Sequence, residues 1–392
     1  MLVDQKLAPH VVVSACDQLS AADRQRILSE NPLSFLNAIR LPEDYSADDD
    51  REPDRHLQDS ITALRGMVRK GVFRRVGRSA FFIHRLTAGA HQQTAVVAEI
   101  PITAYNHGLV LRHEDTRIEQ QSDLGRYIDI VKAGSSPVCL TYRQVPAIDD
   151  IVGSATVAQP ELNFVDSSGT RHEVWQIADT VLTSRLVDLF RDVPTTYIAD
   201  GHHRVAAAAH SGTRDTFMAA LFPTNQMHLV AYHRCIRDLG SMTPLHILQK
   251  LRESFDVTTH PVEDEPPPPA RGVISMCLHG RWHQISLKAA LRSELPWEDI
   301  DVITLQHRVL EPVLGIVEPR SDPRLAYVTS QNSAETIADW INAGIYEAAF
   351  LLHPPSLEEL MAVSDSGRTL PPKSTWFTPK AGAGIFLRFD DP

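Results

Sequence analysis

Cysteine is scarce in this sequence. Only four of the 392 residues are cysteines, and none forms a Cys-x-x-Cys pair. The spacing excludes a small domain stabilised by disulfides and shows no zinc-finger pattern. It is typical of reduced, buried thiols in a cytoplasmic protein. The four residues are Cys16, Cys139, Cys235 and Cys277.

Long hydrophobic runs are also lacking. No stretch of 18 or more apolar residues occurs, so the sequence predicts no transmembrane helix. The first twenty residues contain Asp4 and only a short apolar run, which is not the pattern of a secretory signal. We therefore expect a cytoplasmic protein without a membrane partner.

The chain has no excess of basic residues. It contains 38 Lys and Arg against 49 Asp and Glu, a formal net charge of −11. Proteins that bind nucleic acid usually present a basic face. The charge therefore argues against a nucleic-acid partner and favours a small-molecule substrate.

The length and a hydrophobic content of 43% are enough for two or three domains. The sharpest change in composition is a run of four prolines, which cannot lie inside a helix or sheet. We predict a linker over 263–271 that separates an N-terminal region, 1–262, from a C-terminal region, 272–392, where strand and helix patterns alternate. The expected fold class is α+β, with mixed helices and sheets.

Local patterns predict several elements. Ser20 and Asp23 have the spacing of a helix N-cap, and Asn31-Pro32 predicts the start of a second short helix. Residues 80–104 predict a hairpin through Gly89, and a second hairpin is expected to turn at residues 166–169.

The stretch YIADGHHRVAAAA, residues 197–209, predicts a strand that ends at Asp200-Gly201 and an alanine-rich helix after it. A helix start directs backbone N–H groups at an anion, and glycine allows a ligand to approach the backbone closely. Arg204 can bind phosphate oxygens in a bidentate manner, and His202 and His203 add donors. The pattern predicts a phosphate-binding corner.

Other roles for this corner remain open. Asp200 could cap the helix, orient a substrate hydroxyl, or hold Mg²⁺ through water. The histidines could be ordinary surface residues. Zinc is less favoured, because His202, His203 and His210 have no thiolate or carboxylate partner at ligand spacing.

A candidate catalytic base lies upstream, in residues 109–117. His113 and Glu114 follow a predicted strand and precede a predicted helix, with Thr116 close behind. Glu114 could accept the proton of an alcohol. On spacing alone, an ordinary polar strand end is the favoured interpretation of this segment.

The proline-bounded segment LPPKSTWFTPK, residues 370–380, is a second candidate for binding. Lys373, Ser374, Thr375 and Lys380 suit a phosphate or carboxylate, and the prolines stiffen the loop. The alternative is a rigid closing loop packed by its own aromatic residues. His233-Arg234, at the end of an apolar strand, could face the same cleft.

Five motifs occur in the order seen in a widespread prokaryotic family, domain-of-unknown-function family 1015, and the sequence resembles that family over nearly its whole length. They are NPLSFLNAIRLPE (31–43), HEDT (113–116), YIADGHHRVAAA (197–208), HR (233–234) and LPPKSTWFTPK (370–380). The family usually shows Pro-Pro-Tyr-Asp near the N-terminus, where this chain has Ser14-Ala-Cys-Asp17. If this segment shapes the substrate pocket, the departure means that the sequence does not identify the substrate alcohol.

The pair HE and DGHHR also resembles the free serine kinases of archaea, which have a ParB/sulfiredoxin-type fold. The resemblance implies a ParB/sulfiredoxin-like core with large insertions in the N-terminal region, and the alternating strand and helix patterns after it predict a C-terminal α/β domain. It also implies that Glu114, beside His113, is the catalytic base. Residues 200–204 would then grip the nucleotide phosphates. Arg112 stands where those kinases have proline.

This resemblance implies a kinase that phosphorylates the hydroxyl of free L-serine or a related hydroxy amino acid. Its cofactors would be ATP, or ADP, with Mg²⁺. Three alternatives remain: a nucleotide-binding, ParB-like regulatory protein associated with DNA, a nucleotide hydrolase, and a non-catalytic nucleotide sensor. The sequence allows a homodimer and does not identify the oligomeric state.

Overall fold

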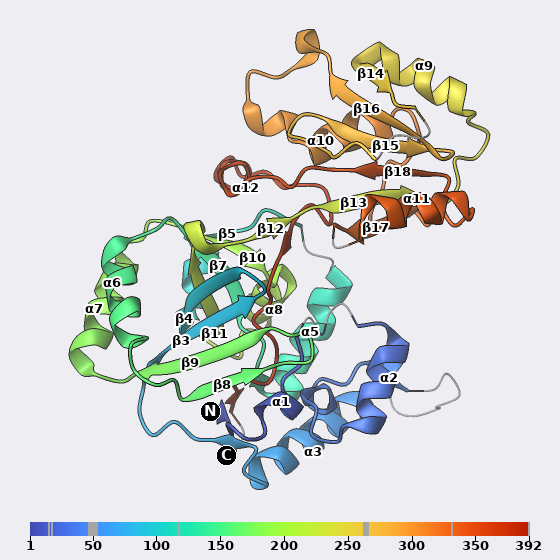
Figure 1. Ribbon diagram of the computed structural model, residues 1–392. Helices are drawn as coiled ribbons and strands as arrows, with labels where there is room; N and C mark the ends of the chain where they lie inside the picture. The colour runs from blue at the N-terminus through green and yellow to red at the C-terminus, as the bar shows by residue number, and fades with distance from the viewer. Residues whose placement is uncertain are drawn as a thin grey trace. The chain divides into compact units, whose positions relative to one another are not determined.

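The structure, a computed structural model, describes residues 1–14, 16, 19–45, 54–115, 118–261, 266–330 and 332–390 (Figure 1). The chain forms two compact units. The first comprises Met1–Arg112, Thr116–His228 and Pro379–Pro392, and the second comprises His113–Asp115 and Leu229–Thr378.

The units divide at a different place from the linker predicted at 263–271. The chain enters the second unit at Leu229. There β14 (Phe255–Thr259), before the prolines, pairs antiparallel with β16 (Arg281–Leu287), after them. Prolines interrupt secondary structure locally, but they do not prevent the strands on either side from pairing. The proline segment is therefore a connection inside one unit.

An eight-stranded mixed sheet forms the first unit, in the order β5-β10-β7-β11-β4-β3-β9-β8 (Figure 1). β10 is parallel to β5 and β7 is parallel to β11, and the other neighbours are antiparallel. The strands are β3 (Phe81–Ala88), β4 (His91–Pro101), β5 (Val110–Leu111), β7 (Val138–Tyr142), β8 (Leu162–Val165), β9 (Arg171–Ile177), β10 (Thr196–Asp200) and β11 (Thr216–Pro223).

Both faces of this sheet are buried. Along β11, Ala219 and Leu221 belong to one hydrophobic cluster, whereas Ala220 and Phe222 belong to another. Side chains alternate between the two faces of a strand, so a continuous apolar run such as β11 fills both cores. Helices and the two chain ends supply the covering layers.

The helices of the first unit cover the sheet in two groups. The clusters contain residues of α4, α6, α7 and α8 on one face, and of α1, α3 and both chain ends on the other. The helices are α1 (Ala8–Val11), α2 (Ala21–Glu30), α3 (Arg55–Arg69), α4 (Ile102–Asn106), α5 (Ile118–Val131), α6 (Pro146–Ala155), α7 (Thr180–Arg191) and α8 (His202–Ser211), with 3₁₀ turns at Phe35–Ala38, Pro42–Asp44 and Thr224–Gln226.

Two short strand pairs complete this unit. β1 (Leu2–Val3) pairs with β2 (Phe73–Arg74), and β6 (Ala133–Gly134) pairs with β20 (Arg388–Phe389). The second pair joins the C-terminal segment to the loop between α5 and β7.

The predicted helix N-cap and the two predicted hairpins of the first unit are confirmed. Ser20 caps α2 and accepts the backbone N–H of Asp23 at 3.1 Å. β3 with β4 and β8 with β9 form the two predicted hairpins. The second short helix expected after Pro32 is a 3₁₀ turn, Phe35–Ala38.

The turn of the second hairpin contains a buried carboxylate, Asp166. Its oxygens accept the side-chain hydroxyl of Ser14, the hydroxyl and N–H of Ser168, the N–H of Thr170, and Nε2 of His172 at 3.1 Å. Burial opposes ionisation of Asp166, but these hydrogen bonds outweigh it and lower its pKa. The carboxylate therefore joins the N-terminal segment to the hairpin.

Replacing Asp166 by asparagine is expected to reduce the free energy of unfolding by about 2 kcal/mol at pH 7, because hydrogen bonds to a charged acceptor are lost. A carboxyl with a lowered pKa stabilises the fold above its unfolded pKa and loses that contribution as the pH falls through its folded pKa. Urea unfolding followed by circular dichroism should thus show the two proteins converging below pH 4, near the ordinary pKa of an aspartate. Equal stability at pH 7 would contradict the role given to the charge.

An antiparallel sheet of six strands forms the second unit, in the order β14-β16-β15-β18-β13-β17. β12 (Leu229–Val230) and β19 (Trp376–Phe377) form a separate pair. The other strands are β13 (Tyr232–Ile236), β15 (Ile274–Leu278), β17 (Leu325–Thr329) and β18 (Ala348–Leu351).

Helices cover both faces of this sheet too. Residues of α9, α10 and α12 belong to one cluster and residues of α11 to the other. The helices are α9 (Pro244–Ser254), α10 (Asp301–Leu305), continued by a π-helical turn at Gln306–Leu310, α11 (Ala334–Asn342) and α12 (Leu357–Asp365), with 3₁₀ turns at Ala289–Leu291 and Pro296–Asp299. The prediction of a mixed α+β fold is confirmed.

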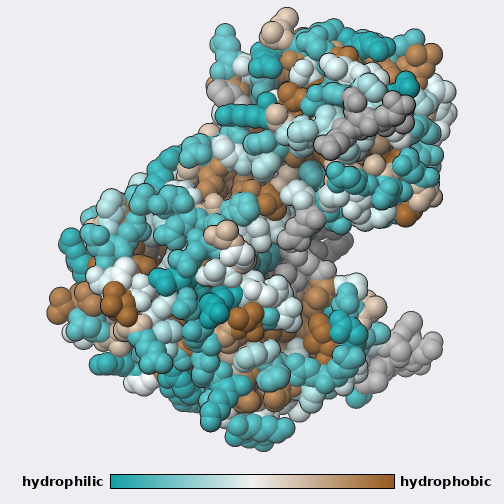
Figure 2. Space-filling view, in the orientation of Figure 1, coloured by the Kyte–Doolittle hydropathy of each residue, from teal (hydrophilic) through white to brown (hydrophobic). Residues whose placement is uncertain are grey.

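Hydrophilic residues cover most of the visible face of each unit (Figure 2). Within the described ranges, no helix is both long enough and apolar enough to cross a membrane.

Candidate functional site

The predicted phosphate corner lies at the junction of β10 and α8. β10 ends at Asp200, and Gly201 then adopts a φ of +100°, after which α8 begins at His202. Such a φ is readily accessible to glycine and costly for residues with a Cβ. The predicted strand, glycine turn and helix start are confirmed.

Arg204 folds back across this junction. Its Nη1 donates to the carbonyl oxygens of Ser136 and Pro137 at 2.8 and 2.7 Å, and its Nη2 is ion-paired with Asp200. The guanidinium also covers Gly201, since a Cβ at that position would lie 3.0 Å from three of its atoms. Arg204 therefore holds the loop before β7 against the start of α8.

A second cation reaches the same carboxylate from the far end of the sequence. Lys380 Nζ donates to Asp200 Oδ1 at 3.0 Å. The side chains of Asp200, Arg204 and Lys380 are 28%, 28% and 16% exposed. The corner therefore gathers two cations against one carboxylate at a helix start, which suits phosphate groups.

Asp200 is ionised because of these neighbours. Burial favours the neutral acid, but the charges of Lys380 and Arg204 outweigh burial and lower the pKa of Asp200. The sequence left open whether Asp200 holds Mg²⁺ through water. Both of its oxygens instead contact cations, and no three His, Cys, Asp or Glu side chains within the described ranges form a group that could hold a metal ion. Asp200, Arg204 and Lys380 therefore do not form a site for a metal ion bound by the protein.

The segment that carries Lys380 is anchored on both sides. The carbonyl of Pro379 accepts the side-chain N–H of Gln93, a buried residue, at 2.9 Å. The N–H of Gly384 donates to Ser135 Oγ at 2.6 Å. The segment that carries Lys380 is thus attached, through Gly384, to the loop that Arg204 also contacts.

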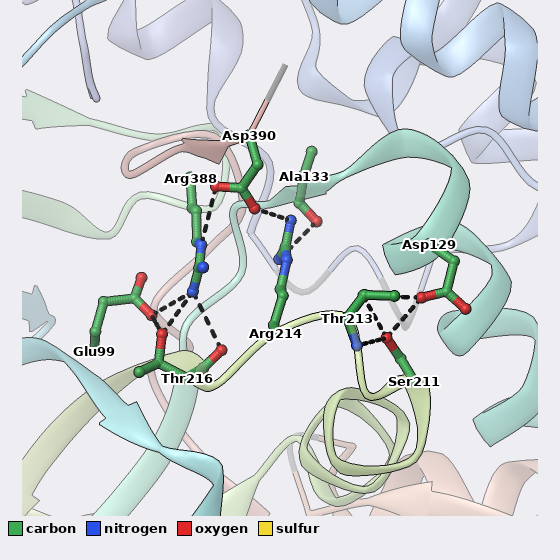
Figure 3. Close-up of polar contacts among 9 residues, drawn as sticks. All are labelled: Glu99, Asp129, Ala133, Ser211, Thr213, Arg214, Thr216, Arg388 and Asp390. Atoms are coloured by element: carbon green, nitrogen blue, oxygen red, sulfur yellow. Dashed lines mark hydrogen bonds and ion pairs between the residues drawn. The ribbon is translucent and has the colours of Figure 1, made fainter. Parts of the chain in front are cut away.

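Charged residues fasten the end of this segment (Figure 3). Arg388 donates to Glu99 at 3.0 Å and to the hydroxyl of Thr216 at 2.6 Å, and Asp390 pairs with Arg388 and with Arg214 at 2.9 Å. These contacts add to the pairing of β20 with β6. The C-terminal segment is therefore an integral part of the first unit.

Replacing Gly201 by alanine is expected to destabilise the protein by about 1–3 kcal/mol, because a Cβ at this φ is strained and collides with the Arg204 guanidinium. Gly212→Ala, at the other end of α8, is the matched control. Gly212 also has a positive φ, +65°, but a Cβ there meets nothing within 4 Å. Thermal unfolding should show a larger loss for Gly201→Ala than for Gly212→Ala. Equal losses would mean that the contact with Arg204 adds nothing.

The candidate base lies in the second unit, in the segment His113–Asp115. The segment 369–375 of the same unit contacts each of its three residues. His113 is buried, its Nε2 lies 2.9 Å from the hydroxyl of Thr375, and its carbonyl accepts the N–H of Leu370 at 2.8 Å. Glu114 Oε1 accepts the N–H of Lys373 at 3.3 Å. The segments His113–Asp115 and 369–375 are thus held together by hydrogen bonds.

Asp115 completes this arrangement. Its side chain accepts the hydroxyl of Thr369 at 3.0 Å, and its carbonyl accepts Nη2 of Arg320 at 3.1 Å. Because successive residues of the segment are held by different partners, the backbone at Glu114 has a defined position.

Arg234 supports the same loop from β13. It is only 2% exposed and donates to the carbonyl oxygens of Tyr232 and Pro372 at 2.9 and 3.0 Å. Its guanidinium lies 4.7 Å from the centroid of the Tyr327 ring. Burial lowers its pKa to about 10, opposed by Tyr327 and Glu114, so Arg234 is a cation at neutral pH.

Lys373 and Ser374 shape the loop itself. Lys373 has a φ of +54°, and its Nζ lies 5.7 Å from the centroid of the Tyr232 ring. The hydroxyl of Ser374 donates to the carbonyl of Pro371. Both contacts are internal to the second unit.

His233 makes different contacts from its neighbour Arg234. Its Nδ1 accepts the N–H of Leu352 at 3.2 Å. Burial, followed by the charge of Arg234, lowers the pKa of His233 to about 4. The residue is therefore neutral near pH 7 and pairs with the backbone beside β18.

The predicted site residues form two groups, one in each unit. Asp200, Gly201, Arg204 and Lys380 meet in the first unit. His202 is buried in the first turn of α8 and His203 follows it there, half-buried. In the second unit, His113 and Glu114 meet Lys373 and Thr375, with Arg234 beside them. Thr116 lies outside the described residues.

Four residues that form hydrogen bonds holding the candidate segments were not predicted from the sequence. They are Gln93, Asp115, Ser135 and Thr369. Asp115 and Thr369 adjoin recognised motifs, so proximity to those motifs could have indicated them. Gln93 and Ser135 have no comparable local signal.

Several solved structures resemble this chain distantly. SbnI with a C-terminal truncation, from Staphylococcus aureus, has 12% identity and a TM-score of 0.39, covering 73% of this chain and 84% of its own. A free serine kinase in complex with AMP has 13% identity and a TM-score of 0.38, covering 74% and 93%. A conserved hypothetical protein from Pyrococcus furiosus has 12% identity and a TM-score of 0.35, covering 74% and 97%.

The family of this chain is identified by its sequence and not by these distant structural likenesses. No curated protein has a significant sequence match to this chain. The model of a family described as "Protein of unknown function (DUF1015)" matches residues 2–303, which is more than half of the chain and includes the HEDT, DGHHR and HR motifs. The protein therefore belongs to the DUF1015 family.

Proposed function

We propose that this protein is a small-molecule kinase that transfers a phosphoryl group from ATP, or ADP, to the hydroxyl of free L-serine or a related hydroxy amino acid. The observation that carries the proposal is the gathering of Arg204 and Lys380 at the start of α8. Phosphoryl transfer depends mostly on positioning and on electrostatic stabilisation, which fixed cations provide.

The nucleotide phosphates are assigned to the start of α8. The first helical turn directs N–H groups outward, and the Arg204 guanidinium lies over Gly201 at the same helix start. Arg204 and Lys380 supply positive charge. The resemblance of DGHHR to the phosphate grip of the serine kinases supports this assignment.

The acceptor hydroxyl is assigned to Glu114. The carboxylate takes the hydroxyl proton as the oxygen attacks the terminal phosphorus and the bond to the leaving phosphate breaks. The order that the 369–375 segment and Arg234 impose on this loop supports the role, since a general base must be held within hydrogen-bond reach of its substrate.

Phosphorus NMR tests the proposal directly. Purified protein is incubated with ATP or ADP, with and without Mg²⁺, and with a panel of hydroxy amino acids. A new phosphomonoester signal that depends on one amino acid is the expected result and identifies the acceptor. Orthophosphate released at the same rate without any acceptor would instead indicate a nucleotide hydrolase, and unchanged nucleotide throughout would remove support for a kinase.

A further inference from the structure

The carboxylate of Asp200 has a cation on each oxygen. Lys380 Nζ lies 3.0 Å from Oδ1, and the Arg204 guanidinium pairs with Oδ2. An aspartate that follows a strand and faces a phosphate corner would be an ordinary place for a magnesium ligand. Here the positions that a metal ion would occupy at the two oxygens contain an ammonium and a guanidinium.

Neither cation is loosely attached. Arg204 also donates to the carbonyl oxygens of Ser136 and Pro137, so its guanidinium is held by three acceptor groups. The backbone beside Lys380 is fixed by the hydrogen bond from Gln93 to Pro379, and Gly384 is fixed by its bond to Ser135. A metal ion that approached Asp200 would meet two anchored positive charges within a few ångströms.

We propose that Lys380 takes the place of a divalent cation at Asp200. Asp200 is then a positioning residue that holds Arg204 and Lys380 together, and it is not a metal ligand. This inference rests on the proposed function for its catalytic meaning, because the two cations would neutralise phosphate charge without a metal bound by the protein. The claim about metal exclusion concerns the protein alone and is tested without nucleotide.

The first experiment measures the binding of Mn²⁺ alone by electron paramagnetic resonance. Wild-type protein should bind no stoichiometric Mn²⁺ at Asp200. Lys380→Ala should bind one Mn²⁺ at least about tenfold more tightly than wild type, because one unit charge beside the carboxylate is removed. The double variant Lys380→Ala/Asp200→Asn should lose the gained site.

Lys380→Arg is the matched control. It keeps a positive charge at the position, so it should bind Mn²⁺ no better than wild type does. Circular dichroism and thermal unfolding verify that each variant folds, and Lys380→Met, which keeps most of the aliphatic stem, replaces Lys380→Ala if the latter does not fold. Stoichiometric Mn²⁺ binding to wild type that Asp200→Asn removes would overturn the inference. So would the absence of any gain on removal of the Lys380 charge.

Calorimetry with ADP separates this inference from the proposed function. Binding of ADP to wild type in EDTA, weakened at least tenfold in Lys380→Ala, would support both. Binding of ADP that requires Mg²⁺ and Asp200, but not Lys380, would overturn the inference and leave nucleotide binding intact. Failure to bind ADP under either condition would count against the proposed function, while the Mn²⁺ measurement would still decide the inference.

Discussion

Replacing Glu114 by glutamine is expected to lower the rate of phosphoryl transfer at least about a hundredfold, which is the usual contribution of a general base. Glutamine keeps an oxygen at the same position, so the hydrogen bond from the N–H of Lys373 can persist. The protein should therefore remain folded and bind nucleotide as before. Phosphorus NMR of product formation, with calorimetry of nucleotide binding, checks both statements.

Asp115→Asn is the control for this substitution. Asp115 is the next residue in the segment, and its side chain also accepts a hydrogen bond, from Thr369. The asparagine keeps an acceptor oxygen and removes one negative charge, as in Glu114→Gln. We expect Asp115→Asn to retain most of the activity. If both variants lost activity equally, the charge or order of the loop would be what matters, and Glu114 would not be the base.

The stability of the second unit is expected to fall as the pH rises from 4 to 7 because of one buried carboxyl, Asp301. Asp301 begins α10, is only 6% exposed, and accepts the N–H of Gly272 at 2.9 Å. Burial, with a contribution from Glu359, raises its pKa from 3.8 to about 7. In this range the folded protein binds the proton and the unfolded chain releases it, so raising the pH favours unfolding.

Asp301→Asn should remove this dependence, because the amide resembles the neutral acid. The difference between 3.8 and about 7 corresponds to at most about 4 kcal/mol. We expect the variant to be more stable than wild type by about 2 kcal/mol or more at pH 8, and of similar stability at pH 4.

Urea unfolding followed by tryptophan fluorescence is suited to this measurement. Four of the five tryptophans, Trp282, Trp297, Trp340 and Trp376, lie in the second unit. Asp299→Asn is the control: this nearby carboxylate accepts the N–H of Ser293 and is half-buried. A stabilisation of Asp301→Asn that is the same at pH 4 and pH 8 would refute the assignment of the effect to ionisation.

The start of α8 was predictable because its causes are local. An apolar strand, a glycine and an alanine-rich run are consecutive in the sequence, and each has a strong conformational preference. The two hairpins and the Ser20 cap were predictable for the same reason. The proline run shows the limit of such rules, since it interrupts the chain locally while β14 and β16 pair across it.

Partners distant in the sequence could not be assigned in this way. Glu114 and the segment containing Lys373 were recognised as separate candidates, although they are bonded across 259 residues. Lys380 was expected to meet a phosphate, and nothing in the sequence indicated that it would meet Asp200, 180 residues away. Asp301 has the local sequence of an ordinary helix start, and only packing around it raises its pKa.

The start of α8, the two hairpins, the Ser20 cap and the residue types at the two candidate motifs could be predicted because they depend on neighbours along the chain. Contacts between distant segments could not be predicted in this way: Lys380 and Arg204 share Asp200, the 369–375 segment contacts His113–Asp115, and Asp301 is buried. These outcomes depend on burial and on contacts between distant segments, because desolvation and Coulomb interactions act through space.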